Sequence, residues 1–423
     1  MVGGLIQLAA YGAQDIYLTS NSQITFFKTV YRRATHFAME SINQLIDGNI
    51  NFGGNITMVI GRNGDLLGRI FLQFKLFDIT PYIQGEYTYA GWIQGVGNYF
   101  VKNASIEIGG QEIDSQYGSW MDIWSELSLP SSLLDGYGKM VGKNFNQANW
   151  QPYEPDEYST LFVPLQFWFC RNPGLALPLV ALQYHEIRLR ISIANFSELI
   201  TTIRGDQYVE PEFSDFVPNL NNSNLQVWCT YYFLDTTERR QFVQNPHEYL
   251  IEQIRGHSGD IKKLSSENLL RLNLNHPTKE IVFVFNRNNS HAPQNDFSMG
   301  FNTIPNGTPE QFAPLGEFKL VLNSGDRFKE RPGEYFRVVQ PYEHHTRTPS
   351  NYIYVYSFAL RPEEHQPSGT CNFSRIDTAQ LLFTLRTSQG LEEYNSNPSY
   401  TLYAPGYNIL RIMSGMGGLA YSN

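Results

Sequence analysis

Apolar and polar residues alternate with a period of two in many short runs of this chain. The run 186–193, EIRLRISI, places Ile187, Leu189, Ile191 and Ile193 on one face and Arg188 and Arg190 on the other. The run 70–76 alternates Ile70, Leu72, Phe74 and Leu76 with Phe71, Gln73 and Lys75. Because successive side chains of a strand point to opposite faces, both runs predict half-buried antiparallel strands.

Short turn and helix signals connect these runs. Asn63-Gly64 and Gly109-Gly110 each stand between two strand-like runs, and such pairs favour tight hairpins because both residues accept positive φ. The segment 117–130 places an apolar stripe at helical spacing before Pro130 and predicts a short helix in a long connection. The members of this stripe are Trp120, Ile123, Trp124 and Leu127.

The run 351–360, NYIYVYSFAL, differs because it is apolar on both faces. Either both faces are buried within the fold, or one face meets another subunit. Strand-like runs occur on both sides of the segment 205–225, which is rich in Asn, Pro and acidic residues and has no Lys or Arg. This segment reads as a linker or long surface connection. With 423 residues and 48.5 kDa, the chain is predicted to form two β-rich domains in tandem.

Overall charge changes the interpretation of one basic segment. Between residues 23 and 37, Phe26, Phe27, Lys28, Tyr31, Arg32 and Arg33 interleave cations with aromatic rings, a pattern that single-stranded nucleic-acid grooves also show. The net charge of -9 and pI near 5.5 argue against a dedicated nucleic-acid binder. We therefore expect no direct nucleic-acid contact.

The search for chemistry finds no catalytic or cofactor-binding motif. The sequence GYGKMVGKN departs from a phosphate-binding loop in spacing and lacks its Ser or Thr. His344-His345 has no further partner at metal-ligand spacing, so a solvated loop is the expectation there. Three distant cysteines form neither a disulfide framework nor a CxxC site. No apolar run is long enough to span a bilayer. The prediction is a protein without enzymatic activity, metal or cofactor.

Four long blocks of the sequence resemble one protein family. They are AAYGAQDIYLTSNSQITFFKTVYRRATHFAMESI, LFVPLQFWFCRNPGLALPLVALQYHEIRLRI, GTCNFSRIDTAQLLFTLR and YNILRIMSGMGGLAYSN. The family is that of the major capsid proteins of nucleocytoplasmic large DNA viruses, above all the algal, Chlorella-type phycodnavirus members. The blocks extend from residue 9 to residue 423, so the resemblance covers nearly the whole chain.

The resemblance implies an all-β fold, a double jelly roll of two tandem eight-stranded antiparallel sandwiches with short helices in long connections. The expected division is an N-terminal arm 1–24, a first jelly roll 25–204, a linker 205–224 and a second jelly roll 225–423. The implied function is structural: a homotrimer forms a pseudo-hexagonal capsomer, and capsomers tile a large icosahedral shell. The implied location is the virion capsid, made and assembled in the host cytoplasm.

The resemblance also suggests roles for single residues. The segment with Phe26, Phe27, Lys28, Tyr31, Arg32 and Arg33 would lie on the inner side of the shell, as an interface near minor capsid proteins and the internal viral membrane. Phe167, Trp168, Phe169 and Arg171 would pack in the core and at the trimer centre. Glycans could be attached at Asn302 or Asn306, in a loop expected to be exposed.

Two other functions stay open at this point. One alternative is a carbohydrate-binding or hydrolytic β-sandwich, which would need an aromatic groove and, for hydrolysis, a carboxylate pair. The other is a minor capsid paralogue of the same virus. For the capsid protein itself, the expected partners are further copies of the chain, neighbouring capsomers and minor capsid proteins.

Overall fold

The structure is a computed structural model of the chain, which forms two units, 1–37 and 38–423. It describes residues 34–48, 50–77, 79, 82–87, 89–143, 160–204, 207–209, 212–213, 220, 225–261, 267–286, 313–386 and 399–421, with scattered positions between 6 and 29. The first unit includes one helical turn, in which the amide of Ala10 donates to the carbonyl of Ile6. The predicted arm 1–24 therefore ends before the boundary of this unit.

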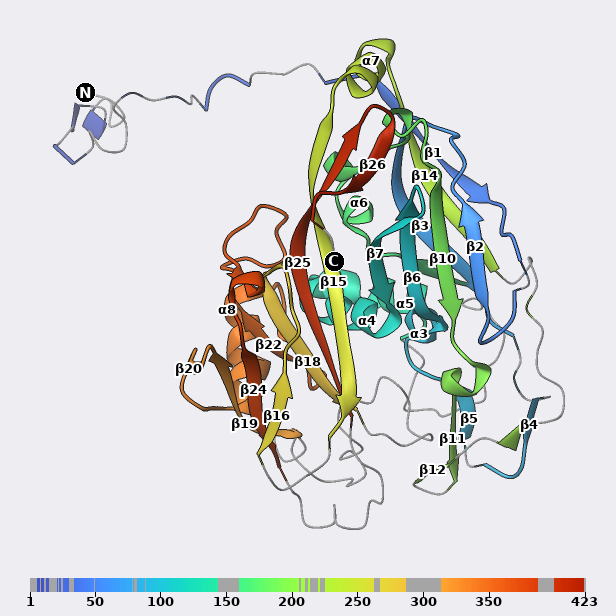
Figure 1. The fold of residues 1–423 in the computed structure, drawn as a ribbon, viewed down its shortest axis with the longest axis vertical. Coiled ribbons are helices and arrows are strands. Elements are labelled where there is room, and N and C mark those ends of the chain that lie inside the picture. The colour runs from blue at the N-terminus through green and yellow to red at the C-terminus, as the bar shows by residue number, and fades with distance from the viewer. Residues whose placement is uncertain are drawn as a thin grey trace. The chain divides into compact units, whose positions relative to one another are not determined.

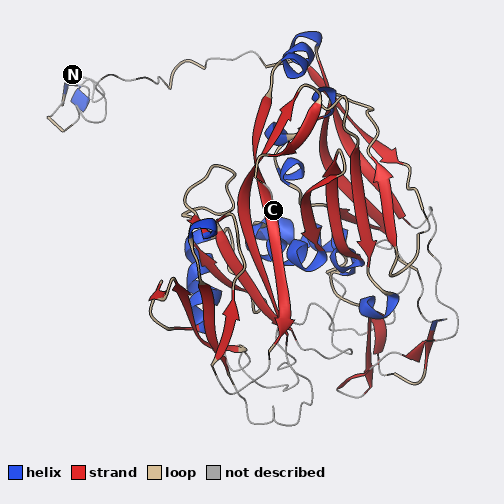
Figure 2. Ribbon diagram, in the orientation of Figure 1, coloured by secondary structure: helices blue, strands red, loops and turns tan. Residues whose placement is uncertain are grey.

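The first sandwich of the larger unit consists of two sheets (Figures 1 and 2). One has the strand order β1-β14-β3-β8 and the other the order β2-β10-β6-β7. The strands are β1 Phe37–Gln44, β2 Asn55–Val59, β3 Leu66–Lys75, β6 Val101–Ile108, β7 Gln111–Tyr117, β8 Thr160–Pro164, β10 Ile187–Ile193 and β14 Leu225–Leu234.

The second sandwich repeats this order. Its first sheet runs β15-β25-β18-β22 and its second runs β16-β24-β19-β20, so each strand takes the place of a counterpart in the first sandwich. The strands are β15 His247–Asp260, β16 Asn268–Arg271, β18 Glu280–Asn286, β19 Leu315–Leu322, β20 Gly325–Asp326, β22 Tyr354–Ser357, β24 Ala379–Leu385 and β25 Ser399–Met413. The expected double jelly roll is confirmed.

Short helices lie in the connections, as predicted, and further short strands either join the four sheets or form two small sheets of their own. The helices are α3 Val96–Phe100, α4 Gly118–Ser128, α5 Leu134–Val141, α6 Trp168–Arg171, α7 Thr236–Gln244 and α8 Gln340–His344, with the π-helical turn η9 Tyr335–Val339 and short 3-10 turns. The added strands are β4 Ile83–Gln84, β5 Tyr89–Trp92, β9 Leu177–Pro178, β11 Ile200–Arg204, β12 Gln207–Val209, β13 Glu212–Phe213, β17 Pro277–Thr278, β21 Arg331–Pro332, β23 Cys371–Asn372 and β26 Met416–Leu419.

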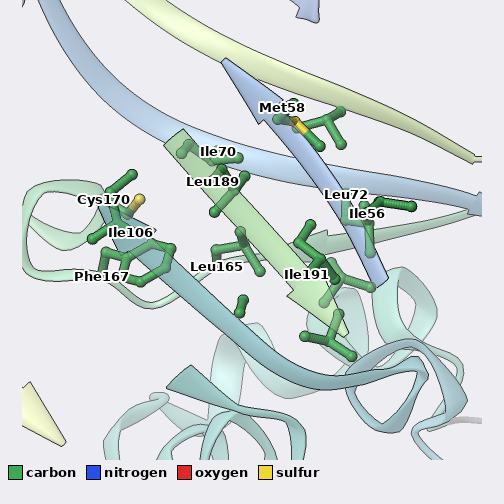
Figure 3. Close-up of a cluster of buried hydrophobic side chains, with 14 of the residues drawn as sticks. Ile56, Met58, Ile70, Leu72, Ile106, Leu165, Phe167, Cys170, Leu189 and Ile191 are labelled. Carbon is green, nitrogen blue, oxygen red and sulfur yellow. The ribbon is translucent and has the colours of Figure 1, made fainter. Parts of the chain in front are cut away.

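Alternation along the strands builds the core of the first sandwich. In β3 and β10 the apolar members of each run are buried, as the sequence predicts. Figure 3 shows Ile70 and Leu72 of β3 with Leu189 and Ile191 of β10 in one cluster. A second cluster fills the other sandwich. The run 351–360 also has its answer: Ile353, Tyr354 and Val355 are fully buried, so the chain itself covers both faces of β22.

One of the two predicted hairpins is present and the other is wrong. Gly109 and Gly110 adopt φ of 59° and 84° and connect β6 to β7, where Ile108 pairs with Gln111. Asn63-Gly64 does not close a hairpin, because β2 pairs with β10 and β3 pairs with β14 and β8. The chain crosses there from one sheet to the facing one, which a local turn signal cannot distinguish from a return.

The predicted division at residues 205–225 also needs correction. β14 pairs with β3 along most of its length, so this strand belongs to the first sandwich although the prediction assigned residues 225 onward to the second. The predicted linker 205–224 is not structureless, since β12 pairs with β11 and β13 pairs with β4. The sequence could not reveal this, because the strand that completes a jelly roll pairs with a strand far back in the chain.

Candidate functional site

The junction between the two sandwiches is built on two long strands. β15 and β25 pair from His247↔Ile412 to Asp260↔Ser399. Midway along this ribbon, Ile251 packs in the core of the first sandwich, while Ile254, three residues later, packs in the core of the second. A hydrogen-bonded ribbon that enters both cores couples the position of one sandwich to that of the other.

Helix α4 is the second part of the junction. It lies between β7 and β8 of the first sandwich, yet its predicted apolar stripe is buried in the core cluster of the second. The Trp120 ring lies 5.3 Å from that of Tyr403 on β25, and Ser119 Oγ lies 2.5 Å from the Tyr403 hydroxyl. The first half of the chain thus supplies part of the hydrophobic core of the second half.

Ion pairs surround α4. Lys143 Nζ lies 2.6 Å from Asp122 and 2.8 Å from Glu126, and Arg347 of the second sandwich lies 2.8 Å from Glu126. Burial opposes the charge on Glu126, but Lys143 and Arg347 outweigh it and hold the pKa of that carboxyl below its usual value. Residues 136–141 of the GYGKMVGKN segment are helical as part of α5, and Lys143 is an ion-pair partner, so this is not a phosphate loop.

A second buried ionic group lies deeper in the junction. Arg171, at the end of α6, lies 2.8 Å from Glu252 of β15, and Lys279 lies 2.9 Å from the other oxygen of the same carboxylate. Lys279 is fully buried and also donates to the carbonyl oxygen of Pro362 at 2.7 Å. Arg171 stacks over the ring of Trp124 on α4 at 5.2 Å. The group joins elements of both sandwiches in one fixed arrangement.

His345 corrects an expectation. The sequence predicted a solvated loop, but the His345 side chain is fully buried, with Nε2 2.9 Å from Glu280 and Nδ1 2.9 Å from Glu363. Burial would lower the pKa of this imidazole, but the two carboxylates outweigh it and raise that pKa to about 9. Its carboxylate partners come from distant parts of the chain, so spacing gave no signal.

The C-terminal hairpin of β25 and β26 holds the first sandwich by backbone contacts. The amide of Tyr184 donates to the carbonyl of Gly415 at 3.0 Å, and His185 Nδ1 lies 3.0 Å from the carbonyl oxygen of Gly417. A Cβ on Gly417 would lie 2.7 Å from Leu182, so close approach requires glycine there. This contact gives the YNILRIMSGMGGLAYSN block a structural purpose that the sequence alone did not suggest.

The structure places the predicted packing residues in the first core. Phe167, Trp168 and Phe169 are all buried there, and the Phe167 and Phe169 rings stack at 5.6 Å. Arg171 follows them and reaches the junction. Their predicted packing at a trimer centre concerns contacts between chains and stays a prediction.

The remaining predicted residues lie in the N-terminal unit or outside the described residues. Phe26 and Phe27 are 91% and 97% exposed, and Lys28 is exposed as well. Tyr31, Arg32 and Arg33 lie outside the described residues, as do Asn302 and Asn306. The inner-face and glycan predictions therefore stay predictions.

The charged groups of the junction have a structural role, because they connect elements of the two sandwiches. These groups pair with one another, and within the described part of the chain no group of His, Cys, Asp and Glu side chains could hold a metal ion. Among the described helices, none combines the length and apolar character that a membrane span requires.

Two family models match consecutive parts of the chain. The model described as "Major capsid protein N-terminus" matches residues 25–235, and the one described as "Large eukaryotic DNA virus major capsid protein" matches residues 238–418. The first match ends at the residue after β14, in agreement with the assignment of this strand to the first sandwich.

Individual relatives match over the whole length. The chain is 41% identical to the major capsid protein of Phaeocystis pouchetii virus and 40% identical to that of Paramecium bursaria Chlorella virus 1, with 100% of each protein covered. A chain in the quasi-atomic model of the PBCV-1 virus capsid superposes with a TM-score of 0.77 at 35% identity, covering 94% of this chain and 100% of that one. This protein therefore belongs to the family of major capsid proteins of large eukaryotic DNA viruses.

Proposed function

We propose that this protein assembles as a homotrimer into a pseudo-hexagonal capsomer that tiles an icosahedral shell. Family membership makes it a structural protein of the virion capsid and not an enzyme or a carbohydrate-binding sandwich. The observation that carries the trimer is the repeated strand order of the two sandwiches. Three copies of two similar sandwiches present six similar walls, so threefold symmetry can imitate a hexagon.

The junction supports this proposal. A hexagonal outline requires the two sandwiches of one chain to keep a constant angle, since each supplies one wall. The β15–β25 ribbon, helix α4 and the buried group around Glu252 fix that angle within the chain. Close-packed interiors resist small distortions, so such a junction suits a rigid tile.

Light scattering on the purified protein, with negative-stain images of the same peak, tests the assembly. The expected result is a species near three times 48.5 kDa with a hexagonal outline. A chain that stays monomeric at high concentration would contradict the proposal.

We further propose that the N-terminal segment with Phe26, Phe27, Lys28, Tyr31, Arg32 and Arg33 contacts other capsid components on the inner side of the shell. The exposure of Phe26 and Phe27 supports this, because burial of large apolar side chains favours association. Replacing Arg32 and Arg33 with Gln should impair shell assembly. Shells that form normally with this variant would remove the interface role.

Glycan attachment at Asn302 or Asn306 is proposed in the same sense, from the resemblance alone. The intact mass of protein taken from virions tests it. A mass above that of the polypeptide, with the excess mapped to the peptide containing both residues, is expected. A mass equal to that of the polypeptide would remove the modification.

A further inference from the structure

We infer that the helical segment η9–α8 of one chain packs on the outer face of the sheet β1-β14-β3-β8 of a second copy. This contact would repeat between chains the one that α4 makes within the chain. The inference rests on the proposed trimer and names the surfaces through which the second sandwich of one copy meets the first sandwich of the next.

The contact within the chain shows what such a surface looks like when covered. In β18, Phe283 points into the second sandwich, where its ring stacks on Phe318 of β19 at 4.7 Å. Val282, one residue earlier, therefore points outward, and so do Val355 and Tyr403, which pair with it on either side. All three are nevertheless buried, and Trp120 of α4 packs against Tyr403.

The corresponding sheet of the first sandwich has an apolar outer face that the chain leaves partly open. In β3, Ile70 and Leu72 point inward and are fully buried, so Phe71 between them points outward. Trp228 of β14 pairs with Phe71 and is half-buried, and Phe162 of β8 on the same face is 41% exposed. Three large rings on one open sheet face form a surface suited to a partner.

The segment η9–α8 is the counterpart of α4 in chain order. α4 lies between β7 and β8, and η9–α8 lies between β21 and β22. Its inner side packs on its own sandwich, where Gln340 accepts a hydrogen bond from the amide of Ser357 at 2.9 Å. Its outer side exposes Val338 by 43% and Tyr342 by 81%. The apolar stripe of α4 is buried in the second sandwich, whereas apolar side chains of η9–α8 remain exposed.

Charge is arranged in the same way at both contacts. Within the chain, Glu126 of α4 pairs with Arg347 of the sandwich that receives the helix. On the open sheet, Arg69 and Lys75 are exposed on the same side of β3 as Phe71. Glu343, next to Tyr342, exposes 51% of its side chain and supplies the carboxylate. The occupant of this face is therefore a second copy of the chain. Its exposed helical segment carries apolar side chains and a carboxylate, which complement the aromatic rings and the cations of the face.

The test compares three variants of the full chain by sedimentation over a range of concentrations. Val338→Asp combined with Tyr342→Asp removes the apolar contact from the helical segment, and Phe162→Asp removes it from the receiving sheet. Leu269→Asp is the matched control, since Leu269 is 56% exposed on β16 in the other sheet of the second sandwich. All changed side chains are exposed, and thermal unfolding of the monomer checks that each variant folds.

We expect both interface variants to raise the concentration needed for trimer formation at least about tenfold, and Leu269→Asp to leave it unchanged. Wild-type trimers with unaffected interface variants would overturn the inference and leave the proposed trimer standing. A wild-type monomer would overturn both. In a second experiment, Tyr342→Cys protein mixed with Phe162→Cys protein should give an oxidised cross-link between chains that neither variant gives alone. Wild-type-like trimers without that cross-link would also overturn the inference.

Discussion

The two sandwiches share a strand order but differ in how the chain covers the same sheet. In the first, β3 and β8 alternate between buried and more open side chains, and the outer face carries Phe71 and Phe162 in partly open positions. In the second, β18 and β22 are buried on both faces, and the apolar stripe of α4 lies in the same hydrophobic cluster, with Trp120 against Tyr403 of β25. The hydrophobic pattern of a strand thus reports what lies on each side of its sheet, and not its place in the fold.

The largest expected effect comes from replacing one tryptophan at the covered sheet of the second sandwich and one at the open sheet of the first. Trp120→Ala should lower the free energy of unfolding by about 3 to 5 kcal/mol, because Trp120 is fully buried between α4 and β25 and leaves a cavity. Trp228→Ala, on the corresponding open face, should cost less than half as much in the monomer, since Trp228 is only half-buried. Chemical denaturation measures both. Equal losses would show that the two faces are covered alike.

The second prediction concerns the buried group at the junction. Glu252→Gln leaves Arg171 and Lys279 without their shared carboxylate and should lower the free energy of unfolding by about 3 kcal/mol. Glu248→Gln is the control on the same strand, because Glu248 pairs with Arg411 at the exposed surface, where about 0 to 1 kcal/mol is expected. Similar losses for both variants would show that the buried ion pairs of Glu252 do not stabilise the junction more than a surface ion pair does.

The third prediction concerns the C-terminal hairpin, which holds the first sandwich by close backbone approach. Gly417→Ala should cost about 1 to 2 kcal/mol, because its Cβ would press on the buried Leu182 side chain. Gly136→Ala in α5 meets no neighbouring atom and should instead stabilise the chain by up to about 1 kcal/mol. Thermal unfolding of both variants gives the signs. A neutral Gly417→Ala would mean that the hairpin can move away without loss.

Local features of this fold could be predicted from the sequence, and features that depend on distant partners could not. Three features depend only on residues close together in the sequence. They are the alternation of β10, the apolar stripe of α4 and the turn at Gly109-Gly110. The hairpin at Asn63-Gly64 failed because the strands on its two sides pair with β10 and β14, which lie more than a hundred residues later.

The candidate site was missed for the same reason. Glu252 lies on β15 and Lys279 lies between β17 and β18 of the second sandwich, and Arg171 reaches them from the first sandwich. An isolated charged residue in a sequence usually indicates solvent exposure, so nothing separates Lys279, which is fully buried, from a surface lysine. The resemblance pointed to Arg171 as a packing residue, and the structure gives that position its charged partner.

The last prediction concerns pH and tests whether His345 is held charged inside the second sandwich. The pKa of this imidazole, about 9, lies above that of an unfolded histidine, so protonation favours the folded state. This stabilisation is complete below about pH 6.5 and is lost as the pH rises through about 9, at roughly 1 kcal/mol per pH unit between pH 7 and 8.

Buried Asp114 also titrates, but in a lower pH range than His345. Burial raises the pKa of that carboxyl to about 7, so its own stabilising contribution is lost from about pH 4 to 7, mostly below the range that His345 controls. Denaturation between pH 7.5 and 9 should therefore show a falling stability that His345→Asn flattens. A variant that keeps the wild-type slope would mean that Glu280 and Glu363 do not hold the histidine charged.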